Sequence, residues 1–397
     1  MRSDFSLQAG AAGALAGFVG FASTFAVIIN GLTKVGASPE QAASGLMAAA
    51  LAMGLCGIVL STVSRLPISS AWSTPGAALL ATTGAVDGGF EAAVGAFLLT
   101  GALIVLSGLF KPLGRWVASI PAPLANAMLA GVLLELCFAP VRAVAEHPLP
   151  ALAIILAWLI VAKLKRVLAM PAAVIVAAIA IAATTHLSAA SFGSPWPHPV
   201  LVTPTLSIGA VIGIALPLFI VTMASQNIPG IAVLSVNGYH PPPGRLFVAT
   251  GLFSIVGAFF GGHTVNLAAI TAAMCAGPDA NPDPKKRYWA AIIAGLIYVI
   301  FGLLAGVAAA FIGASPPILI EAVAGLALLG AFGSSVMNAV NAPVDREAAV
   351  VTLLVTASGV GFLGISGAFW GLIAGGIVML VTRWRALRPP SAPPVKT

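Results

Sequence analysis

The stretches Ser69–Gly84 (SSAWSTPGAALLATTG) and Gly261–Gly277 (GGHTVNLAAITAAMCAG) lie about half a chain apart, and each reads as half a membrane helix preceded by non-helical backbone. In the first, Ser73 or Thr74 followed by Pro75 predicts a helix start, because a hydroxyl caps the first turn and proline is preorganised for it. A matched pair of broken helices is typical of the substrate site of a transporter.

Each short helix would cover only half of the bilayer. A helix of about ten residues spans roughly 15 Å, against about 30 Å of hydrocarbon, so its N-terminus must lie near the midplane. We expect the second helix to run from Leu267 to Cys275, with Thr264 or Asn266 as its cap and Gly277 as its stop. Two N-termini that meet at mid-membrane would form an anion site without Lys or Arg. A re-entrant loop with a structural role is the alternative.

The composition is that of a polytopic membrane protein. Hydrophobic residues make up 59% of 397 positions, charged residues make up 7%, and the mean hydropathy is +1.06, whereas soluble domains carry about 25% charged residues. The polar start, Met1–Gln8, does not read as a cleavable signal, so we expect the first span to be retained. A rule of about 20 apolar residues per span predicts full spans near 9–31, 40–62, 90–110, 121–138, 149–163, 170–184, 206–225, 243–260, 288–313, 316–336, 347–363 and 366–382.

The basic residues give the orientation, since cytoplasmic loops carry an excess of Lys and Arg. If the two short segments also cross the membrane, sixteen basic residues lie inside and only Lys34 and Arg142 lie outside. Omitting either segment spoils this asymmetry, so both termini are predicted to be cytoplasmic. The net charge of +7 then needs no nucleic acid as a partner. The predicted inner residues are Arg2, Arg65, Lys111, Arg115, Lys163, Lys165, Arg166, Arg245, Lys285, Lys286, Arg287, Arg346, Arg383, Arg385, Arg388 and Lys396.

The spans divide into two sets of seven, 9–184 and 206–382, with a short segment third in each set and Thr185–Thr205 as an outer connection. Because seven is odd, the sets must run in opposite directions, as an inverted-topology repeat. The predicted fold class is an all-α polytopic membrane protein with 14 transmembrane segments as a 7+7 inverted repeat and half-helices at segments 3 and 10. Lipid cannot satisfy extended backbone, so Ser69–Trp72 and Gly262–Val265 should pair as antiparallel strands.

Few polar side chains lie within the predicted spans, and each has two interpretations. His263 is either a proton carrier or substrate donor, or a hydrogen-bonded structural histidine. Gln226 and Asn227 precede a Pro-Gly pair, which indicates a helix interruption that faces a cavity, with helix packing as the alternative. Glu135 and Glu321 are the carboxylates deepest in apolar sequence, and they are either coupling residues or scaffold and dimer contacts.

The first span has a face of glycines on which another backbone can approach closely. Phe18 and Phe21 adjoin this face, and with Trp72 and Phe219 they could line an aromatic slot; lipid-facing or core positions are the alternative. The three cysteines lack metal-ligand spacing. No Ser/His or paired-Asp constellation, HExxH or CxxC motif occurs within the spans, so we expect no enzyme activity, no metal and no cofactor. The glycine face comprises Gly10, Gly13, Gly17 and Gly20.

Three strings resemble the signatures of the benzoate/proton symporter family, BenE: SAWSTPGAALL (Ser70–Leu80), SQNIPGIAVL (Ser225–Leu234) and GGHTVNLAAITAAMCAGPDANPDPKKRY (Gly261–Tyr288). The resemblance implies uptake of benzoate with protons across a bacterial inner membrane, in a fold similar to that of the uracil (UraA-like) and nucleobase-ascorbate transporters. Nucleobase relatives usually place a glutamate in span eight, and Gln226 takes its place here. This replacement is chemically sensible, because a glutamate would repel a carboxylate ligand.

The resemblance also implies a division of the chain. In that fold, spans one to four and eight to eleven form a core that moves against a gate, and the protein is often a dimer. The implied core parts are 1–110 and 206–313, the gate parts are 111–190 and 314–384, and 385–397 is a polar tail.

We therefore expect a secondary active transporter that imports benzoate or a similar small aromatic carboxylate by proton symport with alternating access. One proton per anion would cancel a cost of about 2.3 kcal/mol per 100 mV, and His263 and Glu135 are the proton candidates. A passive anion channel or uniporter and a carrier of a nucleobase-like substrate are alternatives. The carboxylate would lie on the backbone near Val265–Leu267 and Ser73. The predicted substrate residues are Ser73, Thr74, Gly76, Trp72, Gln226, Asn227, His263, Thr264, Asn266, Phe18 and Phe21.

Overall fold

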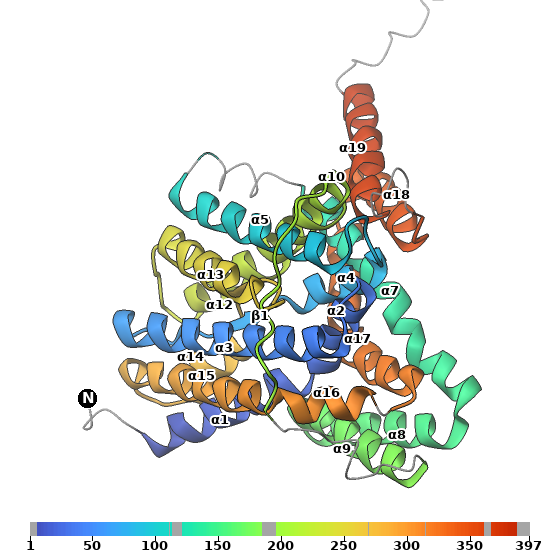
Figure 1. Cartoon of the computed structure of the whole chain (residues 1–397). Coiled ribbons are helices and arrows are strands. Elements are labelled where there is room, and N and C mark those ends of the chain that lie inside the picture. Colours follow the sequence, from blue (N-terminus) through green and yellow to red (C-terminus); the bar gives the residue numbers. More distant parts are fainter. Residues whose placement is uncertain are drawn as a thin grey trace, which may run out of the picture.

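The chain folds into helices and two three-residue strands within the residues that the computed structural model describes (Figure 1). Seven helical segments are long and apolar enough to cross a membrane, and four shorter apolar helices accompany them, which confirms a mostly helical polytopic membrane protein. The described residues are 6–110, 112, 121–184, 196–268, 270–313, 315–360 and 367–386. Outside them lie Arg2, Lys111, Arg115, Arg388, Lys396, the segment 185–195 and the tail from Pro389.

The first half of the chain forms α1 (Leu7–Ala22), α2 (Phe25–Lys34), α3 (Pro39–Ser64), β1 (Ser70–Trp72), α4 (Thr74–Thr83), α5 (Gly89–Leu109), α7 (Ala122–Glu146), α8 (Pro148–Leu164) and α9 (Ala169–Thr184). The second half forms α10 (Ile208–Ala210), η4 (Val211–Ala215), α11 (Leu216–Thr222), η5 (Met223–Asn227), α12 (Ile228–Val236), α13 (Pro243–Ala258), β2 (Val265–Leu267), α14 (Ile270–Ala276), α15 (Tyr288–Leu303), α16 (Ala305–Gly313), α17 (Pro317–Val340), α18 (Arg346–Ala357) and α19 (Gly367–Ala386). Short 3₁₀ turns occur at Arg166–Leu168, Pro284–Lys286 and Pro343–Asp345.

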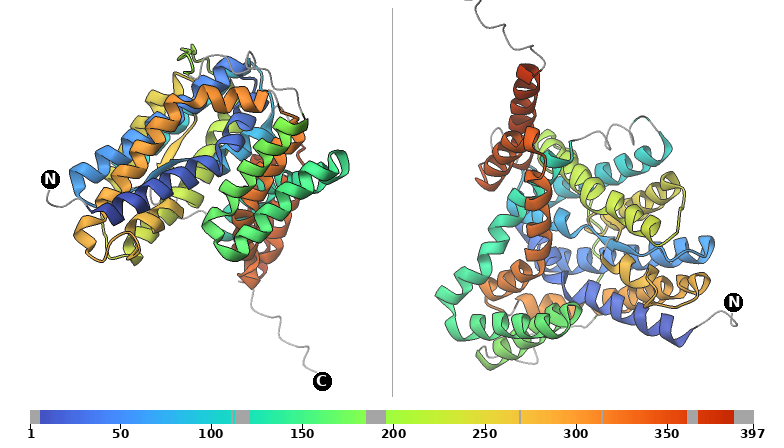
Figure 2. Two further views of the ribbon diagram at one scale, coloured as in Figure 1. Left: turned by 90° about the horizontal axis from the view of Figure 1, so that it is seen from below. Right: turned by 180° about the vertical axis from the view of Figure 1, so that it is seen from behind.

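The helices pack in two groups. In the first, α3 lies against α13 and α15, α5 packs on α13, and α1 packs on α15. In the second, α17 and α18 pack on α7, α18 packs on α19, and α8 packs on α9. The left view of Figure 2 shows the first group, with its blue and orange helices, beside the green and red helices of the second. Gly13 confirms the predicted glycine face, since a Cβ there would collide with the carbonyl group of Ala290 in α15.

The stretches Ser69–Gly84 and Gly261–Gly277 lie side by side, joined by an antiparallel strand pair. Ser70 of β1 faces Leu267 of β2, and Trp72 faces Val265. Because the strands are antiparallel, the short helices α4 and α14 leave the pair at opposite ends. The starts of both helices are thereby held close to one small sheet.

The second strand differs from the predicted range Gly262–Val265, because it runs from Val265 to Leu267. The N–H of Val265 donates to Ser254 Oγ (2.8 Å) and that of Leu267 to Asn227 Oδ1 (2.9 Å), so side chains from other helices hold this backbone extended. The prediction of a helix over Leu267–Cys275 capped by Thr264 or Asn266 is therefore wrong at its start, since α14 begins at Ile270.

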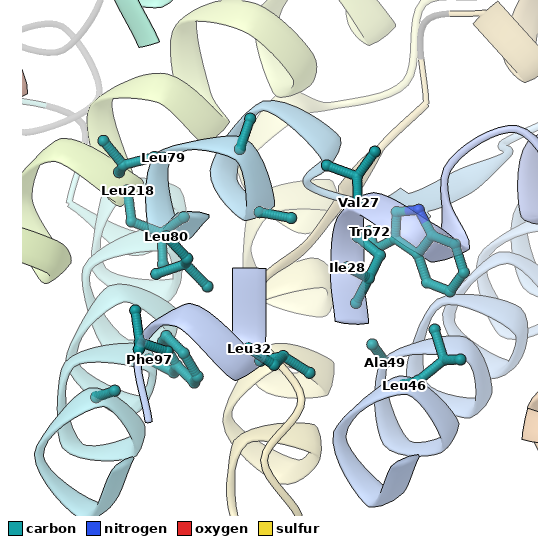
Figure 3. Close-up of a cluster of buried hydrophobic side chains, with 14 of the residues drawn as sticks. Val27, Ile28, Leu32, Leu46, Ala49, Trp72, Leu79, Leu80, Phe97 and Leu218 are labelled. Carbon is teal, nitrogen blue, oxygen red and sulfur yellow. The ribbon is translucent and has the colours of Figure 1, made fainter. Parts of the chain in front are cut away.

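The main hydrophobic core surrounds α4. Figure 3 shows Leu79 and Leu80 of α4 among buried side chains of α2, α5 and α11, with Trp72 of β1 nearby. The α2 helix reaches the backbone of α4 because Gly31 has no side chain, and a Cβ there would collide with the Ala77 carbonyl. The core therefore fixes where α4 begins.

The first predicted span, 9–31, is not one straight helix, because it breaks at Ser23 and Thr24 between α1 and α2. Ser23 Oγ donates to the Val19 carbonyl (2.6 Å), and Thr24 Oγ1 donates to the Gly20 carbonyl (3.0 Å). Hydroxyls that bond back to the preceding turn compete with the helical ladder, which accounts for the break.

The predicted interruption after Ser225 is also wrong, because helical backbone continues from Ile208 to Val236. It changes instead to π-helical turns at Val211–Ala215 and Met223–Asn227. Each π turn precedes a proline in the first turn of the next α-helix, Pro217 or Pro229. A widened turn tolerates the absence of the hydrogen bond that proline cannot donate. The helix therefore continues past each proline with a locally shifted hydrogen-bond pattern.

Candidate functional site

A cavity of about 120 Å³ lies where the ends of the strand pair meet α1, η5, α15 and α17. Trp72 and Met53 form part of its apolar wall, and Leu328 of α17 forms another part. None of its lining residues carries a charged side chain within the described chain. The polar residues that line it are Ser23, Thr24, Thr74, Gln226, Thr271 and Tyr298.

The structure brings three of the predicted substrate residues to this cavity, Trp72, Thr74 and Gln226. Phe18 and Phe21 do not line it. The remaining predicted residues are buried next to the cavity and do not line it: Ser73, Gly76, Asn227, His263, Thr264 and Asn266.

The α4 helix begins at the cavity wall. Ser73 caps it, because its Oγ accepts the N–H of Gly76 (3.2 Å) and its carbonyl accepts that of Ala77 (2.8 Å). Pro75 has no N–H to offer. Within the described residues, the N–H and hydroxyl of Thr74 have no hydrogen-bond partner, so Thr74 is the free polar group at the positive end of this helix.

Ser73 also holds α4 to its neighbours. Its Oγ accepts from Thr222 Oγ1 (2.9 Å), which also lies 3.2 Å from Thr264 Oγ1. The Ser73 N–H donates to the Thr264 carbonyl (3.0 Å). The Asn266 amide lies against the Ser73 N–H and the Leu267 carbonyl. Ser73, Thr264 and Asn266 therefore position the cavity wall and leave no free group at the cavity.

His263 is buried behind the cap of α4. Its Nε2 lies 3.0 Å from the Ser73 carbonyl, so Nε2 carries the hydrogen that is donated. Within the described residues, Nδ1 has no partner. A second proton on Nδ1 would therefore have no acceptor in this arrangement.

Gln226 and Asn227 are adjacent in η5 and face different ways. Asn227 is buried, accepts the Leu267 N–H (2.9 Å) and contacts Met223 Sδ (3.1 Å), so it ties η5 to β2. Gln226 lines the cavity, and its amide makes no hydrogen bond within the described chain. Gln226 is therefore a free donor and acceptor at the cavity, on the kind of π turn that often marks functional sites.

Trp72 is the aromatic wall of the cavity. Its Nε1 donates to Thr24 Oγ1 (2.8 Å), which in turn donates to the Gly20 carbonyl (3.0 Å). Phe21 lies behind the indole at a centroid distance of 5.3 Å and also contacts Phe301 at 4.9 Å. The break in the first span thus orients Trp72, and Phe21 supports it from outside the cavity.

The lining residues that the sequence did not anticipate include Thr271 of α14, Tyr298 of α15 and Gly20 of α1. A Cβ on Gly20 would collide with the Tyr298 hydroxyl and lie 3.1 Å from Thr271 Cγ2. The Tyr298 hydroxyl lies beside Thr271, whose Oγ1 lies 3.0 Å from Ser69 Oγ. These three residues close one side of the cavity.

The remaining candidates lie elsewhere. Phe18 is 38% exposed, and Glu135 is exposed on α7, 4.0 Å from Arg142. Glu321 lies 3.8 Å from Lys34 and lines a second, larger cavity of about 1030 Å³ between α2, α16 and the start of α17. Within the described residues, no cluster of three His, Cys, Asp or Glu side chains could hold a metal ion.

The sequence matches the model of one protein family, described as benzoate membrane transport protein, over residues 3–381. The chain is 40% identical over 370 residues to the inner membrane protein YdcO of Escherichia coli K12, covering 93% of this chain and 94% of that protein. It is 33% identical over 378 residues to a benzoate membrane transport protein of Acinetobacter baylyi, covering 94% of this chain and 95% of that one.

Solved structures of anion transporters share the fold at low identity. SLC26A9 matches with a TM-score of 0.63 at 13% identity, over 95% of this chain and 66% of that one. The transmembrane domain of the cyanobacterial bicarbonate transporter BicA matches with a TM-score of 0.55 at 15% identity, over 95% of this chain and 98% of that one.

Proposed function

Because the chain belongs to the benzoate membrane transport protein family, we propose that it carries benzoate or a similar small aromatic carboxylate through the cavity beside Thr74. The observation that carries the proposal is an uncharged cavity with free polar groups at the start of a short helix. A relative that is named an inner membrane protein supports a place in the bacterial inner membrane.

The size of the cavity suits a single aromatic ring. A dry apolar cavity of about 150 Å³ in another protein binds benzene, and this cavity measures about 120 Å³. Trp72 offers a ring face on one side, and the small side chains of Ala327 and Ala331 leave room on the other.

The carboxylate has donors in the same cavity. The free N–H and hydroxyl of Thr74 lie at the start of α4, where the helix carries about half a positive charge. The Gln226 amide adds a neutral donor. Hydrogen bonds to an ionised group are roughly twice as strong as neutral ones, so this set can hold an anion without a basic side chain.

The architecture that supports transport is the inverted repeat. We assign α4 and α14, each preceded by its strand, to the third segment of each seven-segment half, which gives 14 crossings and two cytoplasmic termini. The core parts would be 1–110 and 206–313, and the gate parts 111–190 and 314–384. The two packed helix groups and the cavity between α4 and α17 support this division.

Alternating access would require the core to move against the gate. The cavity is walled by α4 and α15 on the proposed core side and by α17 on the gate side. Lys34 of α2 and Glu321 of α17 form an ion pair between these two sides, with exposed side-chain fractions of 52% and 26%. Exposed pairs contribute only about 0 to 1 kcal/mol, so this contact can break during movement.

Proton symport is favoured by the energetics of anion entry. An anion that enters a cell at 100 mV, negative inside, costs about 2.3 kcal/mol, and a proton that travels with it cancels this cost. His263 is the candidate that we retain for the proton, because its Nδ1 can take one up and its Nε2 contacts the cap of α4. Since Nδ1 has no acceptor in this arrangement, the protonated form would require a movement that supplies one. Glu135 is exposed and does not line the cavity.

His263→Gln is expected to remove the stimulation of benzoate uptake by an inward proton gradient while benzoate binding changes by less than about threefold. Glutamine can still donate to the Ser73 carbonyl, but it cannot take up a proton near neutral pH. Uptake in liposomes with and without the gradient measures the effect. His198→Gln, in the larger cavity, is the matched control. Undiminished stimulation in His263→Gln would make His263 a structural residue.

The function itself is tested by uptake of labelled benzoate into liposomes that hold the purified protein. We expect saturable, concentrative uptake that an inward proton gradient accelerates. Uptake that never exceeds equilibrium and ignores the gradient would indicate a passive channel or uniporter. Uptake of labelled uracil by a protein that takes up no labelled benzoate would indicate a nucleobase carrier and overturn the proposal.

A further inference from the structure

The segment Gly277–Arg287, which follows α14, contains a buried arginine that the proposed function does not use. Arg287 is 7% exposed. Its Nε donates to the Asn281 carbonyl (2.7 Å), and its Nη1 donates to the Ala276 carbonyl (2.9 Å). These two contacts are to backbone and fasten this segment onto the end of α14, and the Tyr239 side chain also lies against the guanidinium.

The contact to Ala276 has an electrostatic reason. Ala276 is the last residue of α14, and the carbonyl groups at a helix C-terminus have no partners within the helix and carry a partial negative charge. A buried charge is costly unless it is paired or hydrogen-bonded. The helix end and the guanidinium therefore satisfy each other.

The same segment also holds the start of α1. Asn281 Nδ2 donates to Ser6 Oγ (2.7 Å), and Ser6 is the N-cap of α1. Gln8 of α1 donates to the Asp279 carbonyl (3.1 Å). Because Arg287 directly precedes α15, one short segment links the ends of α1, α14 and α15, which lie side by side in Figure 1.

These three helices meet again at the cavity, through Gly20 of α1, Thr271 of α14 and Tyr298 of α15. Thr271 lies only five residues before Ala276, or about 7.5 Å along the helix. A shift of the α14 end would therefore pass directly to Thr271, because so short a helix cannot absorb it.

We propose that Arg287 is a positioning residue for substrate binding, which fixes α14 against α1 and α15 and so sets the spacing of Gly20, Thr271 and Tyr298. The proposal rests on the proposed function in one respect, namely that this cavity holds the substrate. Displacing binding groups by about 1 Å can cost up to 100-fold, so the effect should be visible in KM.

Arg287→Gln is compared with Arg346→Gln, which removes an equivalent bond from Nε to a carbonyl six residues earlier, that of Val340, remote from the cavity. We expect Arg287→Gln to raise the KM for benzoate about tenfold or more and to speed amide exchange over residues 270–276. Arg346→Gln should leave both unchanged, even if the two variants lose similar thermal stability. Arg287→Lys should raise the KM less than Arg287→Gln does, because a lysine can reach one carbonyl.

If Arg287→Gln does not fold, Asn281→Ala tests the same link, because it removes the bond to Ser6 while Arg287 stays. We expect a severalfold rise in KM for this variant. Folded Arg287 or Asn281 variants with unchanged KM and unchanged exchange over 270–276 would overturn the proposal. Faster exchange in Arg287→Gln, together with no benzoate uptake by the unsubstituted protein, would support the positioning of α14 and reject the proposed function.

Discussion

Gln226→Glu is expected to abolish benzoate uptake at neutral pH while the protein stays folded. The substitution keeps the size of the side chain and adds a negative charge at the cavity, next to the groups that we assign to the carboxylate. Two like charges about 4 Å apart repel by about 4 kcal/mol at an effective dielectric constant near 20, which corresponds to nearly 1000-fold in affinity. Benzoate binding to purified protein measures this loss directly.

Two further variants separate charge from shape. Gln226→Met removes the amide at similar volume, and the loss of one hydrogen bond of about 1 kcal/mol should weaken binding by only about fivefold. Asn237→Asp makes an amide-to-carboxylate change at the end of α12, outside the cavity, and should leave binding unchanged. Benzoate affinity that survives Gln226→Glu would place the substrate carboxylate elsewhere.

The start of α4 could be predicted from sequence because its signals are local. Ser73, Thr74 and Pro75 are consecutive, and the cap, the first turn and the free N–H all follow from these three residues. Thr74 was predicted as a substrate residue for this reason, and the structure places it at the cavity.

The start of α14 could not be predicted in the same way. Val265–Leu267 is extended because Ser254 and Asn227 accept its N–H groups, and these residues lie on α13 and η5. A single sequence does not show that either residue accepts these hydrogen bonds. The π turns before Pro217 and Pro229 could not be predicted either, because a proline in an apolar segment is equally typical of a helix break.

The cavity contains polar residues that a sequence does not distinguish from packing residues. Thr271 and Tyr298 are polar side chains surrounded by apolar sequence, and only their convergence on Gly20 shows that they share a wall. Conversely, Phe21 was expected in the aromatic slot, but the Trp72–Thr24 hydrogen bond turns the indole toward the cavity and leaves Phe21 behind it. The orientation of a ring depends on a tertiary contact, which periodicity does not encode.

Gly20→Ala is expected to weaken benzoate binding strongly by moving the Tyr298 hydroxyl. The added Cβ would collide with that hydroxyl, and because Tyr298 lines the cavity, the displaced hydroxyl would move into the space that we assign to the substrate. Overpacking a well-filled site costs about 1 to 3 kcal/mol, which corresponds to roughly 5- to 150-fold in affinity if the strain falls on the cavity. Isothermal titration with benzoate measures the change.

A second substitution identifies the cause. Tyr298→Phe removes the atom that the Cβ would meet, so Gly20→Ala combined with Tyr298→Phe should bind benzoate more tightly than Gly20→Ala alone. Gly333→Ala, in α17, is the matched control, because a Cβ there meets no atom within 4 Å, and alanine favours the helix by about 1 kcal/mol. If the double variant bound no better than Gly20→Ala, the steric contact would not be what limits the cavity, and the wall formed by Gly20, Thr271 and Tyr298 would lose its assigned role.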